Sequence, residues 1–135
     1  MSELRVLHLF ANYKWTGPAD PAIRAAARLR GLGLDVRFTQ AEFVHPGGEH
    51  RVAEELARLQ VPAVRGLALR KHFHIPSLLR DVRRLRALLD REPYDVLHCH
   101  QGGDHLLAAL AVRRRGRKPV VVRSLYDPGA PELSL

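Results

Sequence analysis

The stretch that decides the fold is LRVLHLF, at residues 4–10. Apolar side chains occupy both alternating faces of this stretch, which is typical of a strand in the middle of a sheet that is covered on both sides. Short apolar runs follow at residues 34–39, 63–67, 95–99 and 119–123. Because helical apolar patterns separate these runs, the sequence predicts a parallel sheet with right-handed crossover connections.

We expect four helices between these strands, at residues 20–31, 49–60, 77–91 and 104–115. Asp20, Ser77 and Asp104 are the expected N-caps, since short polar side chains accept hydrogen bonds from the amides of a helix start. The predicted fold class is α/β, an open parallel sheet of about five strands in the order 3-2-1-4-5 with helices on both faces. In that order a ligand crevice forms at the carboxyl ends of the first and fourth strands, so the loops at residues 11–18 and 98–104 are expected to face each other.

The length and composition suit a single domain over residues 1–135. A hydrophobic content of 46% argues against disorder. The single cysteine, Cys99, excludes an intramolecular disulfide framework and lies in a buried type of strand, where we expect it to be inert. No apolar run approaches the roughly 18 residues that span a bilayer, and no signal peptide is present, so we expect a cytoplasmic protein.

The chain is strongly basic, with a formal net charge of +8. All but three of its 22 basic residues are arginines, so the charge indicates either a generally arginine-rich surface or a surface for an anionic partner. An arginine-rich nucleic-acid-binding protein is one alternative function, but aromatic residues make up only 6% of the chain and no reader motif is present. We therefore expect no nucleic-acid partner, and we place a membrane or anion contact at Arg70, Lys71, Arg80, Arg83, Arg84 and Arg86.

Two glycine-containing loops are candidate ligand contacts. Gly17 and Pro18 precede the first helix, where a backbone turn can present amide groups to an anion or phosphate, or serve only as a turn. Neither a GxGxxG fingerprint nor a Walker loop is present. Gly102, Gly103 and Asp104 open the fourth helix, and the two glycines either let the backbone approach a ligand closely or form a tight turn.

His98 and His100 end the fourth predicted strand and point to one face of the sheet, because side chains alternate along a strand. They fit a packed or capping pair, a ligand contact at the crevice, or a metal pair to which His105 adds a ligand. No carboxylate or thiol lies at a supporting spacing, so we expect no metal site.

Four places, in this order, together resemble the N-terminal domain of the family-four glycosyltransferases. They are RVLHLF at residues 5–10, GPADP at 17–21 with GLDV at 33–36, YDVLHCH at 94–100, and PVVVRS at 119–124. Each motif alone is loose, whereas their order and spacing over nearly the whole chain are specific. Enzymes of this family are built from two Rossmann-like domains that face a cleft.

The resemblance implies a Rossmann-like acceptor-binding domain. The complete enzyme would transfer a sugar from a nucleotide-sugar to a cell-envelope glycan, lipid or small-molecule acceptor, with retention of configuration. The glycine loop would approach the donor phosphates, and amides at helix starts would stabilise the leaving diphosphate. The implied substrate- and phosphate-binding residues are Gly17, Pro18, His100, Gly102, Gly103 and Asp104. We expect this domain itself to bind no cofactor, since the nucleotide-sugar donor belongs to the complete enzyme.

The chain departs from the family pattern in two ways. A histidine often follows the fifth strand in the family, and Tyr126 stands there in this chain, so it is the candidate catalytic residue by position alone. The C-terminal donor domain of the family is missing. This chain is therefore expected to be a fragment, a domain that a partner chain completes, or a non-catalytic flavodoxin-like ligand-binding module. We expect the isolated chain to be inactive and to self-associate through the strand at residues 119–123.

Overall fold

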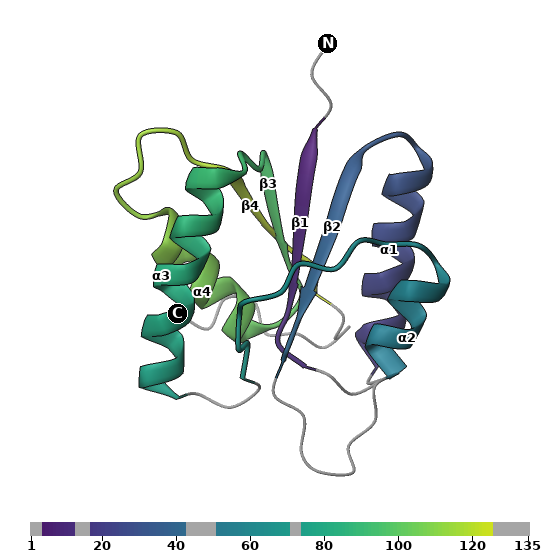
Figure 1. The fold of residues 1–135 in the computed structure, drawn as a ribbon, viewed down its shortest axis with the longest axis horizontal. Helices are drawn as coiled ribbons and strands as arrows, with labels where there is room; N and C mark the ends of the chain where they lie inside the picture. The colour runs from purple at the N-terminus through teal and green to yellow at the C-terminus, as the bar shows by residue number, and fades with distance from the viewer. Residues whose placement is uncertain (1–3, 13–16, 43–50, 71–73, 126–135) are drawn as a thin grey trace.

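Four parallel strands form one sheet between two pairs of helices (Figure 1). The structure, a computed structural model, describes residues 4–12, 17–42, 51–70 and 74–125. Within these ranges the elements follow in the order β1 (Arg5–Phe10), α1 (Ala19–Gly31), β2 (Asp35–Gln40), α2 (Arg51–Arg58), α3 (Ile75–Arg91), β3 (Val96–Cys99), α4 (Gly102–Val112) and β4 (Val120–Arg123).

The strands lie in the order β2-β1-β3-β4, which is the predicted order without its outermost member. β1 and β3 are neighbours in parallel register, with His8 opposite His98 and Leu9 opposite Cys99. The predicted α/β class and open parallel sheet are confirmed. Because the chain order reverses between β1 and β3, the loops that follow these two strands meet at one edge of the sheet.

The prediction of a strand at residues 63–67, the third in the predicted chain order, is wrong, although the segment does lie beside β2. A single parallel bridge joins Ala63 to Phe38. The Phe38 amide donates to the Pro62 carbonyl and the Phe38 carbonyl accepts from the Val64 amide, each at 2.9 Å. The pairing then ends, because Gly66 adopts a φ of +119° that turns the chain out of the extended conformation.

Each face of the sheet has its own apolar core. α1 and α2 cover one face, and the fully buried Phe10, Ile23 and Phe38 belong to that core. α3 and α4 cover the other face, where Leu7 and Leu97 are fully buried (Figure 1). A sheet buried on both faces explains why the first stretch of sequence is apolar at both odd and even positions.

Two helices begin before the predicted caps. Pro18 is the N-cap of α1, and Asp20 lies inside the first turn and pairs with Arg24 at 3.1 Å. His74 is the N-cap of α3, and its Nδ1 accepts a hydrogen bond from the Ser77 amide at 3.3 Å. The predicted caps are wrong by two or three positions because the first turn also favours acidic and small polar side chains.

Candidate functional site

The loops after β1 and β3 lie side by side at the carboxyl edge of the sheet. A Cβ atom added to Gly103 would lie 4.0 Å from the Ala11 Cβ atom. Gly17 and Pro18 lie at the start of α1, and Gly17 is exposed, with open space where a side chain would begin. The structure therefore brings the Gly102–Gly103 turn against the end of β1. Tyr126 and Lys71 lie outside the described residues.

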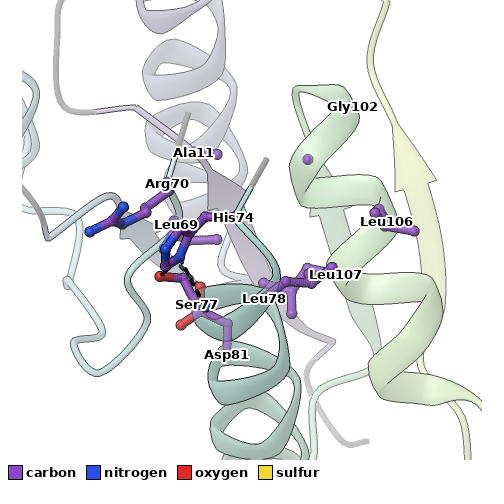
Figure 2. Close-up of a pocket in the computed structure, with 11 residues that line it drawn as sticks. Ala11, Leu69, Arg70, His74, Ser77, Leu78, Asp81, Gly102, Leu106 and Leu107 are labelled. Atoms are coloured by element: carbon purple, nitrogen blue, oxygen red, sulfur yellow. Dashed lines mark hydrogen bonds between the residues drawn. The ribbon is translucent and has the colours of Figure 1, made fainter. Parts of the chain in front are cut away.

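A cavity of about 290 Å³ opens beside this edge, on the face that carries α3 and α4. The end of β1, the segment at residues 69–70 and the first turns of α3 and α4 form its walls (Figure 2). The residues that line it are Ala11, Leu69, Arg70, His74, Ser77, Leu78, Asp81, Gly102, Gly103, Leu106 and Leu107. Apolar side chains thus lie beside polar ones, among them the guanidinium of Arg70, the imidazole of His74 and the carboxylate of Asp81 (Figure 2), a combination typical of small-molecule sites.

Asp81 fixes the segment that carries Arg70 to the rim of the cavity. The carboxylate is buried and accepts hydrogen bonds from the Ala68 amide at 2.8 Å and the Leu69 amide at 2.9 Å. Leu69 has a φ of +46°, which residues with a Cβ rarely adopt. The segment 68–70 lies outside regular structure, so this carboxylate replaces the hydrogen bonds that a strand or helix would supply.

Asp104 organises the turn beneath Gly102 and Gly103, but not as the predicted N-cap. Gln101 is the N-cap of α4, and Asp104 accepts hydrogen bonds from the Gln101 amide at 3.0 Å and the His100 amide at 3.2 Å. Burial raises the pKa of Asp104 to about 7, against the opposing effect of these amides and of the Arg123 charge. The carboxyl group that supports the glycine turn is therefore buried and changes its charge near neutral pH.

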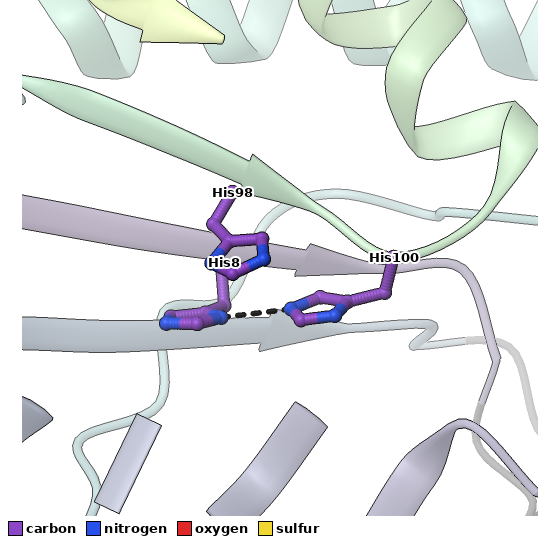
Figure 3. A group of neighbouring side chains, drawn as sticks. All are labelled: His8, His98 and His100. Atoms are coloured by element: carbon purple, nitrogen blue, oxygen red, sulfur yellow. Dashed lines mark hydrogen bonds between the residues drawn. The ribbon is translucent and has the colours of Figure 1, made fainter. Parts of the chain in front are cut away.

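Three histidines gather on the opposite face of the sheet, where α1 and α2 lie (Figure 3). His8 Nδ1 and His100 Nε2 share a hydrogen bond of 2.8 Å. The His98 ring lies 4.4 Å from the His100 ring and 4.6 Å from the His8 ring, between centroids, which confirms that His98 and His100 share a face. Burial and the neighbouring rings lower the pKa of His8 to about 2 and that of His100 to about 3.

His8 completes this group, in the place where the sequence suggested His105. His105 is exposed on α4 and is not one of the three clustered histidines. The signal that would have identified His8 is the register between β1 and β3. These two strands are parallel neighbours, and their register places His8 opposite His98. That register cannot be read from one strand alone.

The basic residues of α3 accompany exposed apolar side chains. Ile75 is 55% exposed and Leu79 is 60% exposed, one helical turn apart near the start of α3. Arg84 donates to the Gly66 carbonyl at 2.9 Å. No helix in the described part of the chain is long and apolar enough to cross a membrane. The predicted belt on α3 consists of three exposed residues and a half-buried one, namely Arg80, Arg83, Arg84 and Arg86.

Comparisons with known proteins agree with this architecture. Residues 22–124 match the sequence profile described as Glycosyltransferase Family 4. No curated protein matches the chain at a significant level.

Among solved structures, a glycosyltransferase from Rickettsia africae aligns with a TM-score of 0.66 at 13% identity, over 90% of this chain and 30% of its own. MurG from Acinetobacter baumannii aligns with a TM-score of 0.57 at 20% identity, over 89% of this chain and 35% of its own. The C-terminal domain of a hydrogenase from Pyrococcus furiosus aligns with a TM-score of 0.62 at 18% identity, over 92% of this chain and 94% of its own. At these identities the similarity concerns the fold alone, and the chain spans about a third of the length of the first two proteins.

Proposed function

Because this chain belongs to Glycosyltransferase Family 4, we propose that it is the acceptor-binding domain of an enzyme that transfers a sugar from a nucleotide-sugar to an acceptor with retention of configuration. The observation that carries this proposal is the cavity beside the carboxyl edge of the sheet, with the first turns of α3 and α4 in its wall. The donor is held by a second domain or a partner chain, so the 135-residue chain alone does not catalyse transfer.

The cavity suits the headgroup of an acceptor. Its volume of about 290 Å³ lies at the lower end of the range for small-ligand sites. Leu78 and Leu107 offer apolar surface to the carbon skeleton of a ligand, and Arg70 offers a guanidinium to a phosphate or carboxylate. The amides at the starts of α3 and α4 favour the same anionic group. These features support an acceptor that carries a negatively charged group.

Gly17 and Pro18 serve the other substrate in this proposal. They precede α1 at the carboxyl edge, where an exposed turn without a side chain lets donor phosphates approach the helix start. Tyr126 stands where the family often has a histidine, and it remains a candidate for a catalytic role. His100 and Asp104 support the crevice from beneath, since both are buried.

A membrane surface fits the exposed part of α3. Ile75 and Leu79 can enter the boundary of a lipid layer while Arg80 and Arg83 contact anionic headgroups. The same helix forms a wall of the cavity, so a lipid-linked or cell-envelope acceptor would reach the cavity from the membrane. We therefore place the complete enzyme in the cytoplasm, peripherally at the inner face of the membrane.

Acceptor binding by the isolated chain tests this function directly. Amide chemical shifts are recorded while glucose 1-phosphate and glycerol 3-phosphate are added, with uncharged glucose and glycerol as matched probes. We expect the phosphates to shift the amides of Ser77, Gly102 and Gly103, and Gly103→Val to abolish these shifts. Gly116→Val is the control, because Gly116 is exposed and does not line the cavity. Shifts confined to other surfaces would contradict the proposal, and tighter binding to random duplex DNA would favour a nucleic-acid-binding protein.

A further inference from the structure

We propose that His8, His98 and His100 form a binding site for one first-row transition-metal ion such as Zn²⁺, Co²⁺ or Ni²⁺. One ring nitrogen from each histidine lies within 4.8 Å of the other two (Figure 3). The site lies on the face covered by α1 and α2, whereas the proposed acceptor cavity lies on the face covered by α3 and α4. It is therefore separate from the proposed acceptor cavity, although it shares His100 with the crevice of the proposed function, and it revises the sequence-based expectation of no metal.

The backbone already holds the three side chains in nearly the required places. His8 lies on β1 and is paired in register with His98 on β3, and His100 follows two residues later on the same face. Tetrahedral coordination with metal–nitrogen bonds of 2.0–2.1 Å places ligand nitrogens about 3.3 Å apart. The His8–His100 contact of 2.8 Å must open slightly, and the other nitrogen separations, which lie within 4.8 Å, must adjust to the same distance. Rotation of the rings about their side-chain bonds would make both changes without moving the strands.

The hydrogen bonding of the rings leaves nitrogen lone pairs for an ion. His8 is fully buried, and its Nε2, which has no hydrogen-bond partner within the described residues, can carry the ring proton. Its Nδ1, which faces the other rings, shares its hydrogen bond with an imidazole of the same cluster and keeps a lone pair for an ion. His98 Nε2 lies 2.6 Å from the Ser124 hydroxyl oxygen, so its ring orientation is fixed by a neighbour, as is usual for metal-bound histidines.

The donor set selects the class of ion. Three imidazole nitrogens suit zinc, cobalt, nickel and copper, whereas magnesium and calcium require oxygen ligands. Three protein ligands leave a fourth position for water or another ligand. His98 is only half-buried and Val122, its partner in register on β4, is 40% exposed, so an ion reaches the buried rings from this part of the sheet.

Metal titration of the complete 135-residue chain tests the site. The chain is purified with a chelator, dialysed and titrated with Co²⁺, whose visible absorption reports coordination by nitrogen. We expect one ion per chain, displacement of Co²⁺ by Zn²⁺, and no effect of Mg²⁺. Zn²⁺ at about 100 times its dissociation constant should raise the Tm by several degrees, because it binds the folded state.

Matched variants locate the ion. His98→Ala should weaken binding at least about tenfold, because one of three ligands is lost, and the half-buried position tolerates the change. His105→Ala, at an exposed histidine of α4, should bind the ion as the parent does. A second control combines His45→Ala, His50→Ala and His72→Ala. Should His98→Ala fail to fold, His98→Asn keeps a polar side chain and serves the same purpose.

The competing interpretation is a hydrogen-bonded histidine cluster without a metal. Absence of Co²⁺ absorption and of a Tm change on adding Zn²⁺ would establish that interpretation and overturn the proposal. Binding that survives His98→Ala, or that falls equally in either control, would also overturn it, since the ion would then lie elsewhere.

Discussion

The carboxylate of Asp81 on α3 accepts a hydrogen bond from the backbone amide of Leu69 at 2.9 Å and thereby holds a buried leucine in a left-handed backbone conformation. The same carboxylate accepts from the Ala68 amide at 2.8 Å. Both hydrogen bonds join α3, which forms one wall of the cavity, to the segment at residues 68–69 that precedes this helix in the chain. The shape of the cavity therefore depends on a polar side chain that does not need to touch a ligand.

Asp81→Ala should lower the free energy of unfolding by about 2–4 kcal/mol, because two amides lose a charged acceptor. Urea denaturation followed by circular dichroism measures this change. Asp90→Ala on the same helix is the control, since the Asp90 side chain is 67% exposed and its pair with Arg115 contributes at most about 1 kcal/mol. Equal losses in the two variants would contradict the role assigned to Asp81.

Asp104 should make stability depend on pH. Its pKa of about 7 in the folded chain lies above its ordinary value of 3.8, so its contribution is full below pH 4 and is lost as the pH rises through 7. Asp104→Asn cannot ionise, and its stability relative to the parent should increase by a few kcal/mol between pH 4 and pH 8. A stability difference that stays constant over this range would show that the carboxyl group titrates normally.

Cys99 should resist thiol reagents in the folded chain. Burial raises the pKa of its thiol to about 12, so very little thiolate is present at pH 8. We expect modification to be at least about 100-fold slower in buffer than in denaturing urea, because reaction requires opening of the sheet. Comparable rates in the two conditions would contradict the burial of β3.

The exposed side of β4 should cause self-association or recruit a partner. Val120 is 62% exposed and Val122 is 40% exposed on this edge strand. Light scattering should show oligomers that Val122→Lys reduces, since a charge on an edge strand opposes pairing. Leu32→Lys is the control, because Leu32 is 77% exposed at the end of α1. A monomer at high concentration, or micromolar binding of a nucleotide-sugar by the isolated chain, would contradict the dependence on a second domain.

The basic part of α3 should bind anionic vesicles in a salt-sensitive manner. Each arginine near an anionic surface contributes about 1 kcal/mol, so replacing Arg80 and Arg83 by serine should weaken binding about 30-fold. Replacing the exposed Arg113 and Arg114 by serine is the charge-matched control. Co-sedimentation measures both variants, and absence of binding at low salt would exclude the membrane surface.

The sequence predicted the order of the sheet because each central strand is apolar enough to identify by itself. The prediction of an outermost strand at residues 63–67 failed because Gly66, with a φ of +119°, turns the chain away and ends the pairing with β2. The predicted helix starts were displaced because polar side chains inside the first turn also accept hydrogen bonds from nearby backbone amides, as Asp104 does from the Gln101 amide. Local sequence patterns therefore predict that a helix or strand exists better than they predict its first and last residues.

The candidate sites were predicted less completely than the fold. Gly102 and Gly103 were identified because a loop between a strand and a helix must lie at the carboxyl edge. The wall formed by Leu69 and Arg70 was not, since this irregular segment is positioned by Asp81, twelve or more residues away along the chain. The involvement of His8 depends on the register between two strands, which is a tertiary property.

The contact between residues 62–64 and Phe38 covers one edge of the sheet and leaves the other edge available for further strands. Both backbone groups of Phe38 are already engaged on the outer side of β2, and Pro62 has no amide hydrogen to offer to a further strand. A larger protein built around this domain can extend the sheet far more readily beyond β4. The segment at residues 62–64 therefore protects the β2 edge of the sheet, and the β4 edge is the one at which further strands pair more easily.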